Sequence, residues 1–251
     1  MIKSFLEYIN ENYDKNESSL LQYAKDIINC IKKDNSPEGE YIEIRDLEYS
    51  SPDMFDLVIQ LKRESNPNFK QDSHFKSLSW EKINFDQYGF ALDANTRIDK
   101  QNLIVPEIIF TIIVDPNREP DLYTELNYKL IDVVAHELNH TNQIGWNRKP
   151  FKVRPSSNVK RSDSKKSYKY FLLPDEIESM VKGMYIRSKK QGVSIDKIFD
   201  KYLVPFLMNG NISDVEYNKV LSAWVTHTLE NYPDAKLSLE DDKIKRIIDQ
   251  I

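Results

Sequence analysis

The sequence predicts an α+β fold, and three observations carry this prediction. Alternating or β-branched stretches gather between residues 41 and 114, and the strongest of them is 106–114. Apolar residues spaced three or four apart, as on one face of a helix, recur in the first 31 residues and after residue 174. The strands therefore lie in one block that helices follow, an order typical of α+β rather than α/β proteins.

The chain is expected to begin with two helices. A short amphipathic stretch covers 5–9, and Ser18 or Ser19 is the expected cap of a second helix that ends near Ile31. The turn-forming residues at 35–39 stop that helix.

Three strands are predicted next. Alternation predicts strands at 41–45 and 55–61, and the β-branched run predicts one at 106–114. The polar stretch 64–86 predicts no regular element. A helix is expected from about Leu122 to Ile144, with Gly145 as its C-cap.

The last third is expected to be helical. Pro174 and Asp175 suit a helix start, Ser194 can cap a helix, and Ser213 with Glu216 forms a capping box. The expected helices run over 174–187, 195–207, 213–232 and 239–248.

Between the strand-rich and helical parts lies a strongly basic segment, 147–170. It has nine basic residues and one acid, a charge of about +8. We favour a solvated loop here over the alternative, a contact surface for an acidic partner. The expected organisation is a sheet-containing lobe at 1–146, the basic loop at 147–170 and a helical lobe at 171–251.

Composition excludes several classes. With 6 glycines the chain has no glycine-rich phosphate loop, and Cys30 as its one cysteine rules out an intramolecular disulfide or a four-cysteine zinc module. No signal peptide or membrane-spanning run is recognisable, so we expect a cytoplasmic protein without a membrane partner. The net charge of −5 makes nucleic acid an unlikely partner.

One motif carries chemistry: His136-Glu137-Leu138-Asn139-His140, inside the helix expected at 122–144. Residues four apart on a helix share a face, so the imidazoles of His136 and His140 can converge on one metal ion. Zn²⁺ with three protein ligands keeps a fourth position for water. Glu137 is then the expected general base for that water.

The motif and its preceding strand resemble the zincin metallopeptidases, whose active-site helix carries H-E-x-x-H. No histidine stands at the metzincin spacing, because Trp146 occupies that position. The stretch from Glu176 to Ser179 is similar to the glutamate helix of the gluzincins. This resemblance implies Glu176 as the third ligand, 36 residues after His140, with Glu178 as the alternative.

The chain departs from the gluzincin pattern at one position of that helix. Met180 stands where the family usually has an aspartate that supports a ligand histidine. Gluzincins also use a tyrosine or histidine from the downstream lobe to stabilise the transition state, and the candidates here are Tyr168, Tyr170 and His227. For His227 we favour a packed, hydrogen-bonded histidine.

These observations predict a zincin-like, gluzincin-type zinc metallopeptidase that acts on a protein or peptide substrate. The substrate backbone is expected to pair along an edge strand at 108–114. One alternative is a zincin-fold metal-binding structural or interaction protein without proteolytic activity. Another is a metal-dependent regulatory protease that is fused to a repressor or acts on one, and the lack of a clear helix-turn-helix in the chain disfavours it. Richness in Lys, Asn, Ile and Tyr is typical of an AT-rich genome and suits a phage origin.

Overall fold

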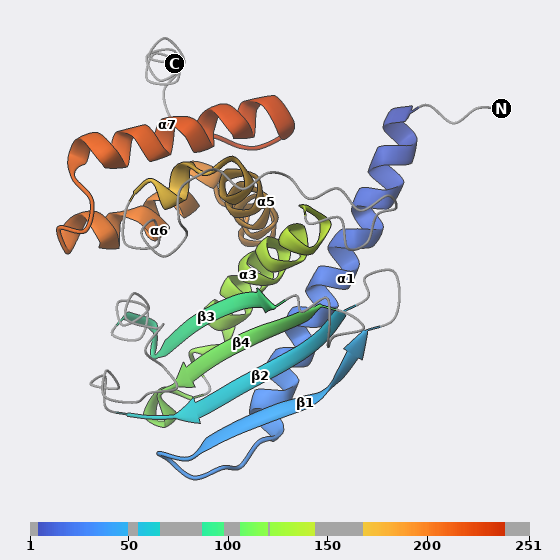
Figure 1. Ribbon diagram of the computed structural model, residues 1–251, viewed down its shortest axis with the longest axis vertical. Coiled ribbons are helices and arrows are strands. Elements are labelled where there is room, and N and C mark those ends of the chain that lie inside the picture. The colour runs from blue at the N-terminus through green and yellow to red at the C-terminus, as the bar shows by residue number, and fades with distance from the viewer. Residues whose placement is uncertain are drawn as a thin grey trace. The chain divides into compact units, whose positions relative to one another are not determined.

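The three predicted strands and a fourth, unpredicted one form a mixed sheet in the computed structural model of the chain (Figure 1). The structure describes residues 5–49, 55–65, 87–97, 106–119, 121–143 and 168–238. Within these ranges it has five α-helices beside the sheet, which confirms the α+β class. Contacts divide the chain into two units, residues 1–137 and 138–251.

The sheet has the order β1-β2-β4-β3. Strands β1 and β2 are antiparallel, β2 and β4 are parallel, and β3 and β4 are antiparallel. Their bounds are Tyr41–Tyr49 for β1, Phe55–Arg63 for β2, Phe90–Arg97 for β3 and Glu107–Val114 for β4.

Strand β4 is an interior strand, so the prediction that 108–114 forms the edge is wrong. β4 pairs along its length with β2 on one side and β3 on the other. Seven of its eight residues are buried, as expected for a strand that is covered on both faces. Among the described residues, the edge on this side of the sheet is β3.

The sequence analysis missed β3. Its sequence, FALDANTR, is poor in β-branched residues and contains Asp, Ala and Asn, which strands usually avoid. The strand forms because Phe90–Arg97 pairs with β4 at eight positions, from Phe90 opposite Val114 to Arg97 opposite Glu107. Long-range pairing here outweighs local preference.

The first helix, α1, is continuous from Phe5 to Lys33, so the two separate helices predicted here are wrong. Ser18 and Ser19 lie inside it, away from both of its ends. The penalty for serine in a helix interior is only a few tenths of a kcal/mol, roughly, and α1 offsets it by burying a long apolar face. That face packs on the sheet, where the Tyr23 ring meets the Phe55 ring of β2 edge-on at 5.2 Å between centroids.

Helix α3 runs from Tyr123 to Gln143, as predicted to within a residue at each end. A short 3-10 turn, η3 at Pro116–Arg118, leads from β4 towards α3. The Asp115 carboxylate caps this turn, because it accepts a hydrogen bond from the backbone N–H of Asn117. Lys32 of α1 lies over the Tyr123 ring at 4.7 Å from its centroid, so α3 begins beside the end of α1.

The second unit contains three of the four helices predicted in the last third. They are α5 at Pro174–Gln191, α6 at Ile195–Met208 and α7 at Asp214–Asn231. A 3-10 turn that was not predicted, η4 at Tyr170–Leu172, precedes them. The capping box of Ser213 and Glu216 is confirmed, whereas Ser194 occupies its N-cap position without a side-chain hydrogen bond. Trp224 joins the helices, because its buried indole donates to the Phe171 carbonyl and its ring packs edge-on against Phe199.

Some predictions lie outside the described residues. They concern Gly145, nearly all of the basic segment 147–170 and the helix expected at 239–248. No helix within the described ranges combines the length and apolar character that crossing a bilayer requires.

Candidate metal centre

The two histidines of the motif lie on α3 and are buried. His136 is 8 % exposed and His140 is 9 % exposed. The helix is unbroken across the motif, so its geometry alone puts the two imidazoles one turn apart on one face.

The third member of the site is Glu176, in the first turn of α5. Pro174 at the start of this helix suits the first turn, where a backbone N–H is not needed, and the acidic first turn complements the helix dipole. The Glu176 carboxylate is 1 % exposed, and its Oε2 lies 3.4 Å from His140 Nε2. His136, His140 and Glu176 each offer a ligand atom, and these atoms lie within 4.8 Å of one another.

This group has the composition of a metal site, and the separation of one pair of its ligand atoms suits a bound ion. Two imidazoles and one carboxylate are a common ligand set for a catalytic zinc ion, and ligand atoms around a tetrahedral zinc stand about 3.3 Å apart. The separation of His140 Nε2 and Glu176 Oε2 matches that value without any rearrangement. The buried His-His-Glu group could therefore hold a metal ion.

A hydrogen bond from the edge strand β3 orients Glu137, the predicted general base. The Thr96 hydroxyl of β3 donates to Glu137 Oε2 at 2.8 Å and also lies 3.3 Å from the Glu137 carbonyl oxygen. The other carboxylate oxygen, Oε1, lies 3.8 Å from His136 Nε2. Glu137 is thus buried and oriented next to one of the two histidines, while Thr96 went unnoticed because β3 was not predicted.

A second hydrogen-bonded group supports His140. Asn139 Nδ2 donates to Ser179 Oγ at 3.0 Å, and Ser179 Oγ lies 3.5 Å from His140 Nδ1. Met180, at the position where the gluzincin pattern has an aspartate, is instead a buried apolar residue. The position of Ser179 near the site could have been predicted from the sequence, because a residue three positions after Glu176 lies on the same side of a helix.

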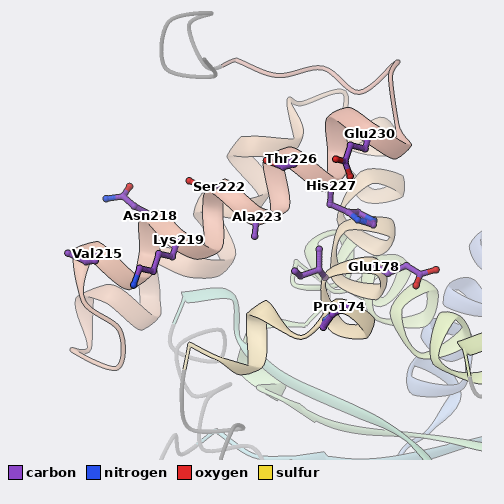
Figure 2. A pocket seen from close by; sticks show the side chains of 11 residues that line it. Pro174, Glu178, Val215, Asn218, Lys219, Ser222, Ala223, Thr226, His227 and Glu230 are labelled. Carbon is purple, nitrogen blue, oxygen red and sulfur yellow. The ribbon is translucent and has the colours of Figure 1, made fainter. Parts of the chain in front are cut away.

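The alternative ligand Glu178 belongs to a different environment. It lines a cavity of about 790 Å³ between α5 and α7, together with Pro174, Thr226 and His227 (Figure 2). Residues two apart on a helix point in different directions, so Glu178 and Glu176 lie on different faces of α5. The structure includes Glu176, and not Glu178, in the buried group.

Two of the three candidate transition-state donors, His227 and Tyr170, have other contacts in the structure. His227 lines the same cavity as Glu178, and Asn231 Nδ2 lies 3.3 Å from its Nδ1. Burial lowers the pKa of His227, against the opposing effect of the nearby Glu178 and Glu230 carboxylates. Tyr170 lies in η4 with its ring edge-on to Phe171 at 5.7 Å. A role for either residue in catalysis stays a prediction.

Comparison of the chain with protein-family models, with curated proteins and with solved structures finds no match.

Proposed function

We propose that this protein is a zinc-dependent metallopeptidase of gluzincin type. The observation that carries the proposal is the buried His136–His140–Glu176 group with the carboxylate of Glu137 beside it on the same helix. Two neutral imidazoles and one carboxylate leave a divalent zinc ion with a net positive charge, which suits Lewis-acid catalysis. The motif spacing and the downstream glutamate both resemble that family.

Each residue has a defined task in this proposal. Bound Zn²⁺ supplies Lewis-acid chemistry, since it polarises a carbonyl group and makes water acidic enough to lose a proton near neutral pH. Glu137 accepts that proton and later delivers it to the leaving amine. Thr96 fixes the Glu137 carboxylate through its 2.8 Å hydrogen bond, so that the base keeps one orientation.

We further propose that an extended substrate pairs along the outer side of β3. An exposed sheet edge offers backbone donors and acceptors to another extended chain. Strand β3 is the edge strand within the described residues, and its Thr96 is the residue that contacts Glu137. A peptide on this edge would therefore run close to the general base.

The decisive experiment separates metal binding from turnover. Protein purified without chelator should contain close to one zinc per chain and should cleave an unfolded protein such as casein. Glu137→Gln retains the shape and the hydrogen-bond acceptor for Thr96, so it should keep zinc and thermal stability. It should lose turnover by about 10²–10⁴-fold, the usual contribution of a general base.

Glu125→Gln is the matched control, because it changes a carboxylate to an amide on the same helix in its first turn. It should leave both zinc content and turnover unchanged. If the parent binds zinc but cleaves nothing across a broad peptide library, the peptidase proposal is wrong and a non-catalytic metal-binding protein is preferred.

A further inference from the structure

Four polar groups behind His140 form a chain of hydrogen bonds whose direction can be worked out. Lys182 Nζ lies 3.4 Å from Asn139 Oδ1, Asn139 Nδ2 lies 3.0 Å from Ser179 Oγ, and Ser179 Oγ lies 2.9 Å from the carbonyl oxygen of Asp175. Asn139 and Ser179 are buried, at 6 % and 0 % exposed.

The ends of this chain determine the direction of every bond in it. A lysine ammonium group only donates, so the Asn139 oxygen faces Lys182 and the Asn139 amide N–H₂ faces Ser179. A backbone carbonyl only accepts, so the single hydroxyl proton of Ser179 goes to Asp175. Ser179 Oγ must therefore act as an acceptor towards its other neighbours.

One of those neighbours is Nδ1 of His140, 3.5 Å from Ser179 Oγ. A hydroxyl oxygen with its proton committed elsewhere can only accept from an imidazole, so it favours the tautomer with the proton on Nδ1. In that tautomer Nε2 carries the lone pair, and Nε2 is the atom that lies 3.4 Å from Glu176 Oε2. Two electron-rich atoms then face each other in a buried place, an arrangement that a cation between them stabilises.

We propose that Ser179, oriented by Asn139 and Lys182, is a positioning residue that holds His140 in the Nδ1–H tautomer and thereby makes Nε2 a metal ligand. In the gluzincin pattern an aspartate at the position of Met180 supports a ligand histidine. In the proposed arrangement Ser179 and the Asn139 amide support His140 instead. The inference rests on the proposed metal site but not on peptidase activity.

The test compares two buried serines of α5. Like Ser179, Ser188 is buried and its hydroxyl donates to a backbone carbonyl of the same helix, that of Tyr185 at 2.8 Å. Ser188 lies nine residues further along α5, so it is the control that does not contact His140. Zinc affinity is measured by competition with a chromogenic chelator. Ser179→Ala should weaken zinc binding by about 10–100-fold, the usual effect of losing a partner of a ligand histidine. Ser188→Ala should bind zinc like the parent, with a similar melting temperature in the metal-free form.

A second measurement keeps the proposal testable whether or not zinc binds. The chain has four histidines, so long-range ¹H–¹⁵N spectra of the full-length, metal-free protein at alkaline pH are simple to assign. His140 should show the Nδ1–H pattern in the parent and in Ser188→Ala, and should lose that preference in Ser179→Ala. An Nε2–H pattern in the parent, or unchanged zinc affinity in Ser179→Ala, would overturn the inference. A parent that binds no zinc but shows the Nδ1–H tautomer would overturn the metal site and the ligand role of Nε2, and would support only the positioning of His140 by Ser179.

Discussion

Glu176→Gln should lower metal affinity without lowering the stability of the metal-free protein. Glu176 is 1 % exposed, so its carboxylate is almost fully removed from water, and glutamine occupies nearly the same volume. In the proposed site, zinc loses one of its three protein ligands in this variant. If the roughly 10–16 kcal/mol of zinc binding seen for four-ligand sites is shared equally, one ligand contributes about 2.5–4 kcal/mol, or about 10²–10³-fold in affinity.

The metal-free protein should melt at the same temperature as the parent or higher. In the proposed Nδ1–H tautomer, the lone pair of His140 Nε2 faces Glu176 Oε2, 3.4 Å away, so the parent would hold two acceptors face to face. Glutamine removes the buried charge, and its amide N–H₂ can donate to Nε2. A purely structural ion pair between Glu176 and a protonated His140 would instead make Glu176→Gln less stable than the parent.

The assay uses zinc competition with a chelator and thermal unfolding in the presence of that chelator, both near pH 8. Glu178→Gln is the matched control, because it makes the same chemical change two residues further along α5, in the cavity that His227 lines. It should leave zinc affinity within about twofold of the parent, a difference of about 0.4 kcal/mol. If Glu176→Gln retains zinc and loses stability, or if Glu178→Gln is the variant that loses zinc, the ligand assignment is refuted.

Two further predictions concern the edge strand β3 and Asp34, the residue that follows α1. Thr96→Val removes the hydroxyl that donates to Glu137 Oε2 while keeping the side-chain shape. Because a hydrogen bond to a charged group contributes about 1.5–3 kcal/mol, kcat/KM should fall by about 10–150-fold. The zinc content of Thr96→Val should equal that of the parent, and Thr96→Ser, which keeps the hydroxyl, should have the turnover of the parent. Equal activity of the parent, Thr96→Val and Thr96→Ser would contradict the role of Thr96. Burial raises the pKa of Asp34, but hydrogen bonds from Ser36 and Arg63 outweigh it and bring that pKa below its ordinary value of 3.8. The stabilisation is present above about pH 4 and lost as the pH falls further, so urea unfolding from pH 7 to 3 should show a smaller loss in Asp34→Asn than in the parent.

The elements that local patterns define were predictable from the sequence alone. The β-branched run of β4, the periodicity of α3 and the capping box at Ser213 each depend on residues close together in the chain. The same holds for His136 and His140, because a spacing of four residues on a helix brings two side chains together whatever the rest of the fold does. Local spacing also showed that Glu176 and Glu178 lie on different faces of α5, although not which face meets α3.

The tertiary structure decided what depends on partners distant in the sequence. Strand β3 forms only because β4 lies beside it, and this pairing makes β4 interior and brings Thr96 to Glu137 from 41 residues away. The packing of α5 likewise brings Glu176 and Ser179 to His140 across 36 and 39 residues. Sequence periodicity reports which face of an element is apolar, but the neighbour of that face is set by packing and backbone pairing over the whole unit. The helix that carries His136 and His140 was therefore readable in the sequence, while the groups that contact Glu137 and His140 from other elements required the fold.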